Sequence, residues 1–191
     1  MRRRSLSIYA IVALLSLNAI LASRTTLAAE VPVAAEKNPP GDIPDSQVFI
    51  AYTSPLGFTI KVPEGWPRTD RPDGVTFADK FGAVDVTVSA AATAPTSSSV
   101  KAVEAAALEQ SGRAVKIDTT EAVGLPAGPA VLIKFHSNSE PNAVTSKRIR
   151  LEHDRYLIQR GGKLVTIDFS APAGADNVDQ WKLMSQSFEW K

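Results

Sequence analysis

The chain has 191 residues, no cysteine and a formal net charge of +1. Without cysteine it cannot form disulfides, zinc–thiolate sites, iron–sulfur clusters or a thiol nucleophile. Four of its 21 basic residues and none of its 20 acidic residues lie within residues 1–28, so the rest of the chain is mildly acidic and gives no electrostatic indication of nucleic-acid binding.

The first 29 residues have the pattern of a secretory signal peptide. Arginines at Arg2 to Arg4 precede an apolar run from Leu6 to Ala22, and small residues follow up to Ala29. This order predicts export, with cleavage after Ala28 or Ala29, and an extracytoplasmic location, periplasmic or secreted. The apolar run is about 17 residues long, at the short end of the range for a membrane span, so a retained N-terminal anchor is the alternative. The membrane would then contact the chain only through this segment.

Residues 30–46 are rich in proline and carry no apolar period. Pro32, Pro39, Pro40 and Pro44 interrupt any regular structure in this segment. We therefore expect a linker that spaces the following domain from the cleavage site or the membrane.

Alternating apolar and polar residues predict the first strands of a domain that spans residues 47–191. The pattern covers residues 47–53 and 58–62, and Pro63 ends the second of these strands. Further strands are expected at residues 75–77 and 84–88, where valines alternate with polar residues. Such alternation is typical of strands with one packed face and one solvated face.

The apolar period changes after Ser99 and returns to alternation after Gly112. Helical spacing predicts a helix that begins after N-cap oxygens at Ser97 to Ser99 and ends at Ser111-Gly112. Its apolar face consists of Val100, Val103, Ala107 and Leu108. Strands are then expected at residues 114–123, 130–136, 147–159 and 163–170, the last two joined by a turn at Gly161-Gly162.

A second helix is expected after Asp176, which is suited to cap it. The apolar residues expected to cover a sheet from this helix are Val178, Trp181, Leu183, Met184 and Phe188. Because short turns join the strands, the sequence predicts an α+β domain: an antiparallel β-sheet of about six to eight strands packed by two helices.

The segment from Pro55 to Trp66 reads Pro-Leu-Gly-Phe-Thr-Ile-Lys-Val-Pro-Glu-Gly-Trp, and Tyr52 precedes it. This segment resembles the opening hairpin of the PsbP family, in which Gly-Phe, an alternating strand and Pro-x-Gly-Trp follow one another. The glycine hairpin at Gly161-Gly162 and a terminal helix ending Ser187-Phe188-Glu189-Trp190 are similar to the end of such domains. The resemblance covers roughly residues 47–191 and implies a PsbP-like α/β sandwich.

The family includes extrinsic subunits of photosystem II and many secreted bacterial proteins of unknown role. By fold it also includes a nuclear import factor that binds Ran. Because one fold serves such different roles, the resemblance by itself implies no activity. No metal ligand or photosystem-contact residue of the family matches a position in this chain.

The residues of this chain carry no motif for catalysis or for cofactor or metal binding. The two histidines, His136 and His153, lie on different predicted strands, and Glu152 and Asp154 should point away from His153. Two metal alternatives stay open: a zinc site, if distant strands bring both histidines and a carboxylate together, and a weak calcium site on the loop acids Asp42, Asp45, Asp70 and Asp73. We therefore assign no catalytic, cofactor-binding or metal residue from the sequence, and we expect no cofactor.

Basic residues gather on the predicted hairpin and the strand expected beside it. We interpret this group as a possible docking patch for an acidic protein or an anionic lipid. The alternative is a solvated sheet face balanced by Glu140, Glu152 and Asp154. The patch consists of Lys134, Arg148, Arg150, Arg155, Arg160 and Lys163.

These observations predict an exported, non-catalytic binding or assembly module with an unknown protein partner and unknown oligomeric state. One alternative is an extrinsic subunit of a photosystem II type, which requires a photosynthetic host. The other is an extracytoplasmic hydrolase, which requires a concave pocket containing paired carboxylates or a Ser/His pair.

Overall fold

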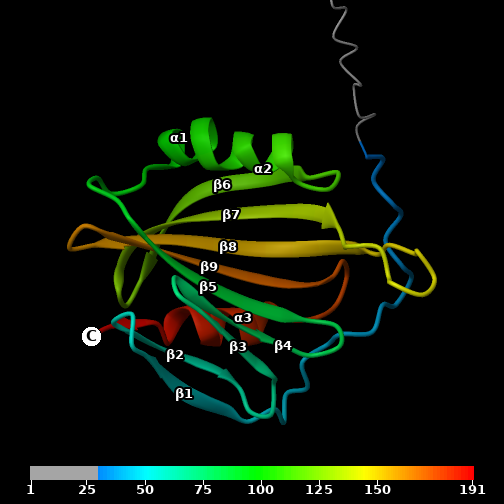
Figure 1. The fold of residues 1–191 in the computed structure, drawn as a ribbon, viewed down its shortest axis with the longest axis horizontal. Helices are drawn as coiled ribbons and strands as arrows, with labels where there is room; N and C mark the ends of the chain where they lie inside the picture. Colours follow the sequence, from blue (N-terminus) through cyan, green and yellow to red (C-terminus); the bar gives the residue numbers. More distant parts are fainter. Residues whose placement is uncertain (1–29) are drawn as a thin grey trace, which may run out of the picture.

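The computed structural model describes residues 30–191, so the predicted signal peptide lies outside the described residues. Two antiparallel sheets make up most of the domain (Figure 1). The smaller has the order β1-β2-β10, and the larger has the order β3-β4-β5-β9-β8-β7-β6. The strands are β1 (Phe49–Ser54), β2 (Phe58–Pro63), β3 (Arg68–Arg71), β4 (Gly74–Ala78), β5 (Ala83–Ala90), β6 (Lys116–Leu125), β7 (Gly128–Asn138), β8 (Arg150–Arg160), β9 (Lys163–Pro172) and β10 (Glu189–Trp190).

The helical segments are α1 (Ser97–Val100), the π-helical turn η1 (Lys101–Ala105), α2 (Ala106–Ser111) and α3 (Val178–Gln186). The first three run on without a break, so the described chain has two helices, as predicted. The α+β class and the large antiparallel sheet are confirmed. The second, three-stranded sheet was not predicted, because alternation within a strand does not reveal which sheet the strand joins.

Hydrophobic cores lie on both faces of the seven-stranded sheet. One core contains Leu132 and packs against α3 and the small sheet through Trp181, Met184 and Phe58. The other contains Ile133 and Phe135 and packs against the first helix. Because Leu132 and Ile133 are neighbours in β7, they point to opposite faces, and β7 is buried on both sides.

The first helix begins with a capping box. Thr96 is the N-cap, and its hydroxyl accepts a hydrogen bond from the backbone N–H of Ser99, while the Ser99 hydroxyl accepts one from the N–H of Thr96. These contacts satisfy two backbone donors that a helix start otherwise leaves unpaired. The helix then crosses the β6–β7 side of the sheet, which places the end of α2 near the end of β7 (Figure 1).

The end of the chain differs from the prediction. The terminal helix stops at Gln186 rather than continuing to Trp190, and Glu189–Trp190 forms β10 against β2. The N-cap is Asn177 rather than Asp176. Phe188 is fully buried and its ring stacks on Phe58 at 5.7 Å between centroids. Burial of this ring beside β2 explains the change from helix to strand.

The strand β3 was not predicted, because Arg-Thr-Asp-Arg contains no apolar residue. It forms the edge of the large sheet and pairs only with β4. An exposed, charged edge strand suits this position because charges discourage pairing with another chain.

Residues 30–46 lack helix and strand, but they pack against the domain, which the linker prediction did not anticipate. Ile43 is only 6% exposed and belongs to the main core. Its backbone N–H donates to Asn177 Oδ1 at 2.7 Å, and Asn177 Nδ2 donates to the carbonyl of Gly41 at 3.0 Å. Within residues 30–191, no helix is long and apolar enough to cross a membrane.

Candidate functional site

A cleft of about 820 Å³ lies where the end of α2 meets the end of β7 and the beginning of β8. Its apolar wall consists of Leu108, Val115, Phe135 and Leu151. Its polar wall comes from four places: the N-terminal segment, the turn after α2, the end of β7 and the beginning of β8. The polar residues include Glu30, Arg113, Ser137, Asn138, Glu140, His153 and Arg155.

A chain of hydrogen bonds runs from this cleft into the sheet. Ser137 Oγ lies 2.8 Å from His153 Nε2, and His153 Nδ1 lies 2.8 Å from Asp168 Oδ1. The three residues come from the adjacent strands β7, β8 and β9, and the strand register places them on one face. The His153 ring is held flat against Phe135, with 4.2 Å between ring centroids.

The chain continues under the first helix. Arg155 Nε donates to Asp168 Oδ2 at 2.6 Å, and Arg155 Nη1 donates to Glu104 Oε1 in η1 at 2.9 Å. Burial raises the pKa of Asp168, but the hydrogen bond from His153 and the charges of His153 and Arg155 outweigh it and hold that pKa below its ordinary value. Burial lowers the pKa of Arg155, and the charges of Asp168 and Glu104 reverse this and raise it. Asp168 is therefore an ionised carboxylate in the interior.

This ionised carboxylate determines what His153 can do. A carboxylate only accepts hydrogen bonds, so His153 Nδ1 carries the proton and, in the neutral ring, Nε2 accepts from the Ser137 hydroxyl. A serine, an imidazole and a carboxylate joined in this order can transfer a proton from the serine oxygen. The cleft therefore contains the Ser/His pair that the hydrolase alternative requires.

The mouth of the cleft holds a second polar group. The Glu30 carboxylate lies 3.1 Å from Arg148 Nε and 3.3 Å from Arg113 Nη1, and it accepts a hydrogen bond from Asn138 Nδ2 at 2.9 Å. The Asn138 hydrogen bond, followed by the charges of Arg148 and Arg113, holds the pKa of Glu30 below its ordinary value. Arg113 also pairs with Glu140.

Asn138 and Arg150 form the buried support of this mouth. They are only 3% and 7% exposed. Arg150 Nη1 donates to Asn138 Oδ1 at 3.1 Å and to the Ala114 carbonyl at 2.8 Å. Burial lowers the pKa of Arg150. These bonds fix the Asn138 amide in one orientation toward the N-terminal segment.

The structure divides the predicted basic patch. Arg148 and Arg150 reach the cleft mouth, although Arg148 lies in the loop before β8 rather than on the strand. Arg155 lies under the first helix, and Lys134 pairs with Asp154 at 3.3 Å. Lys134 pairs with Asp154, and the next pair along β7 and β8 is Phe135 with His153. Because successive side chains in a strand point to opposite faces, Lys134 and Asp154 lie on the sheet face opposite His153.

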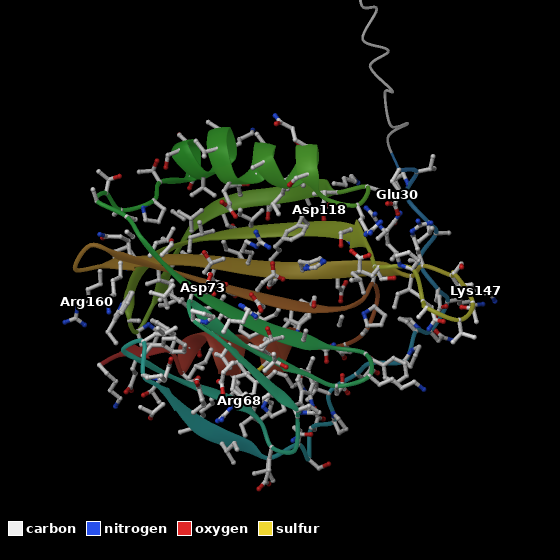
Figure 2. The ribbon with its side chains drawn as sticks, in the orientation of Figure 1. Glu30, Arg68, Asp73, Asp118, Lys147 and Arg160 are labelled. Atoms are coloured by element: carbon white, nitrogen blue, oxygen red, sulfur yellow. The ribbon has the colours of Figure 1, made fainter. Side chains whose placement is uncertain are left out.

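The remaining two residues of the patch lie at the far end of the hairpin. Arg160 is exposed at the tip, at the opposite end of the domain from Glu30 and Lys147 (Figure 2). Lys163 Nζ donates to the carbonyl of Leu56 at 3.2 Å. The six basic residues therefore do not form one continuous surface, and a docking role for any of them stays a prediction.

Sequence reasoning missed Ser137, Asp168, Asn138 and Arg113. The signal in the sequence was weak: Asp168 lies between the buried residues Ile167 and Phe169 in an alternating strand, and nothing in that alternation distinguishes it from a solvated polar residue. Only the register of β7, β8 and β9 shows that this face is covered by a helix. In the described residues, no group of three or more histidine, aspartate or glutamate side chains is arranged to hold a metal ion.

Comparison with solved structures shows a PsbP-like fold. Cyanobacterial PsbP (CyanoP) from Synechocystis sp. PCC 6803 superposes with a TM-score of 0.53 and 19% identity, over 79% of this chain and 98% of that chain. The resemblance predicted from the sequence is thus confirmed for the fold. At this identity the likeness concerns the fold alone and carries over no residue's role.

Two bacterial proteins give lower scores. PA94 of Pseudomonas aeruginosa, a protein of unknown function and putative regulator, has a TM-score of 0.47 and 12% identity, over 73% of this chain and 94% of that chain. LpqN of Mycobacterium tuberculosis, involved in cell envelope biogenesis, has a TM-score of 0.47 and 12% identity, over 75% of this chain and 89% of that chain. No protein-family model and no curated protein matches the chain.

Proposed function

We propose that this chain is an exported, non-catalytic binding or assembly module whose partner docks at the mouth of the cleft. One observation carries the proposal: Arg113, Arg148 and Asn138 converge there above an apolar wall. A polar rim around an apolar centre is the usual anatomy of a protein interface.

An acidic partner can pair with Arg113 and Arg148 in place of Glu30 and Glu140, the carboxylates that these arginines contact within this chain. The chain after residue 28 contains 17 basic and 20 acidic residues, so the arginines at the cleft mouth are a local feature rather than part of a general positive charge. Charge complementarity at such a rim speeds association and selects the partner. The extracytoplasmic location in this proposal rests on the signal-peptide pattern of residues 1–29.

The test is capture of the partner from gently fractionated extracts of the native host. We expect Arg148→Glu to reduce the captured partner at least about tenfold, because it places a like charge against an acidic surface. The control is Arg160→Glu, which makes the same charge change at the far end of β8 and should leave capture unchanged. Arg150→Glu is unsuitable because Arg150 is buried and its loss would disturb the fold.

Equal capture by the Arg148→Glu and wild-type proteins would rule out this docking face. A wild-type protein that runs as a free monomer in its native extract would weaken the assembly role altogether. A photosystem role remains a prediction, since the shared fold is all that favours it, and a non-photosynthetic host would eliminate it.

A second candidate function is ester hydrolysis, favoured by the hydrogen-bonded chain Ser137–His153–Asp168. In that reaction Ser137 Oγ attacks the ester carbonyl carbon while His153 Nε2 takes the hydroxyl proton. The proton then passes to the departing alcohol oxygen as the ester bond breaks. Water attacks the acyl-serine in the same way, which releases the acid and restores Ser137.

A fluorophosphonate probe tests this second function because it reacts only with activated serines. We expect one adduct, on Ser137, that Ser137→Ala abolishes and Ser111→Ala leaves intact. Ser111 is a matched control, since its hydroxyl lies at the same cleft but contacts only the Ala107 carbonyl. An unlabelled wild-type protein, or labelling that survives Ser137→Ala, would eliminate the hydrolase candidate.

A further inference from the structure

The segment Glu30–Val33 lies in the cleft mouth as a ligand lies in a binding site. The Glu30 carboxylate contacts Arg148 Nε at 3.1 Å, Arg113 Nη1 at 3.3 Å and Asn138 Nδ2 at 2.9 Å. Only 24% of the Glu30 side-chain surface is exposed. Convergence of several donors on one carboxylate is the way proteins recognise an acidic group.

The same site also recognises the peptide backbone. Asn138 Nδ2 donates to the carbonyl of Val31 at 2.9 Å, and Asn138 Oδ1 accepts from the N–H of Val33 at 3.0 Å. Because Pro32 follows Val31, the backbone at Val31 is restricted to extended conformations. One buried amide, oriented by Arg150, thus binds both a C=O and an N–H of a short acidic segment.

We propose that the cleft mouth is a binding site for an acidic peptide segment of a partner protein, and that Glu30–Val33 occupies this site within its own chain. The inference rests on the proposed docking function and specifies the chemistry of its partner. The partner's segment presents a carboxylate to Arg113 and Arg148 and its backbone to Asn138, and it displaces the chain's own residues.

The backbone contacts favour a peptide over an anionic lipid. A lipid phosphate can accept hydrogen bonds from the arginines, but it has no N–H to give to Asn138 Oδ1. The chain's own segment is also held mainly by polar contacts, since Val31 is 76% exposed. Such contacts exchange readily with equivalent groups of another peptide, because little apolar surface must be uncovered.

Because Glu30–Val33 occupies the cleft mouth of its own chain, the site has a lower apparent affinity for a peptide added in solution. The measured dissociation constant equals the intrinsic one divided by the fraction of molecules with an open site. Glu30→Gln removes the carboxylate but keeps the size of the side chain, so it opens the site without altering the arginines.

The experiment uses the chain without its signal peptide and a fluorescein-labelled peptide Glu-Val-Pro-Val-Ala, the sequence of residues 30–34. Fluorescence anisotropy should show about tenfold tighter binding to Glu30→Gln than to wild type, as expected if roughly a tenth of wild-type sites are open. Glu36→Gln, the same change at an exposed position of the same segment, should bind as wild type does. Adding Arg148→Gln to Glu30→Gln should reverse the gain.

Equal affinities of Glu30→Gln and wild type for the peptide would overturn the inference. Tighter binding of Glu30→Gln to phosphatidylglycerol vesicles without tighter binding to the peptide would overturn it in favour of a lipid. The docking proposal is tested separately. Suppose that Arg148→Glu abolishes capture of the partner but Glu30→Gln does not increase it. The docking face is then supported, and the proposal that Glu30–Val33 occupies the site is overturned.

Discussion

At the scale of single residues, Asp168 is the centre of the buried polar chain. Its carboxylate is the shared partner of His153 and Arg155, and its side chain is only 11% exposed. A buried charge is tolerated when it is paired on each side, and removing one partner leaves the others uncompensated. Its neighbours in β9, Ile167 and Phe169, are fully buried.

We expect Asp168→Asn to lower the free energy of unfolding by about 3 kcal/mol near neutral pH, because Arg155 loses a buried counter-charge. The folded-state pKa of Asp168 lies below its unfolded-state value, so the unfolded chain binds the proton more readily. The stabilisation is therefore present above the unfolded-state pKa and is lost as the pH falls through the folded-state pKa. Urea unfolding of both proteins should show their stabilities converging as the solution becomes strongly acidic.

Asp118→Asn is the control for this prediction. Asp118 pairs with His136 at 2.6 Å, but its side chain is 31% exposed and lies on the edge strand β6 (Figure 2). Its replacement should cost less than about 1 kcal/mol, as is usual for exposed ion pairs. Similar losses for both variants would show that the buried chain contributes no special stability.

At the scale of elements, strands were predicted more successfully than helix ends. Alternation in β5 correctly placed Val84 and Val86 in the core. In α3, helical spacing also pointed to Val178 and Leu183, which are 68% and 41% exposed. The helix has nine residues, so it presents a short apolar face, and the sequence does not show which residues at its edges reach the sheet.

The burial of Phe188 beyond the helix gives the element-scale prediction. Phe188→Ala should cost about 3–5 kcal/mol, because it leaves a cavity in the main core beside Phe58 of the small sheet. Leu183→Ala, at a half-exposed position of α3, should cost less than about 1 kcal/mol. Thermal or urea unfolding measures both, and an equally large loss for Leu183→Ala would contradict the observed exposure of Leu183.

At the scale of the whole molecule, the N-terminal segment joins parts of the domain that are distant in sequence. Ile43 and Gly41 are held by Asn177 before α3, and Glu30 is held by Asn138 at the end of β7. The segment runs along the outside of the domain between these points (Figure 1). The N-terminal segment, residues 30–46, is therefore attached to the domain at two places.

Removing the apolar contact made by Ile43 should loosen the N-terminal segment. Ile43→Ala should cost about 2–4 kcal/mol and should speed limited proteolysis between residues 30 and 46, because the side chain leaves the main core. Val31→Ala is the control, since Val31 is 76% exposed and its truncation should change neither measurement. Unchanged proteolysis of Ile43→Ala would show that the polar contacts alone hold the segment.

The sequence by itself determined the local properties of this protein: the strands, the approximate positions of two helices and the α+β class. These follow from periods of apolar residues over short stretches, which depend only on neighbours in the chain. The resemblance in residues 55–66 added the PsbP-like fold, which the comparison with CyanoP supports.

Only the tertiary structure decided which distant residues meet. Ser137 and His153 are 16 residues apart and His153 and Asp168 are 15 apart, and their contact depends on the register of three strands. Glu30 meets Asn138 across 108 residues. Alternation of apolar and polar residues within one strand shows which side chains share a face of that strand. The register between strands and the path of the loops determine which residues lie beside them on the next strand. For this reason the sequence indicated a basic patch, and the structure divided it and brought two of its arginines to the mouth of a cleft.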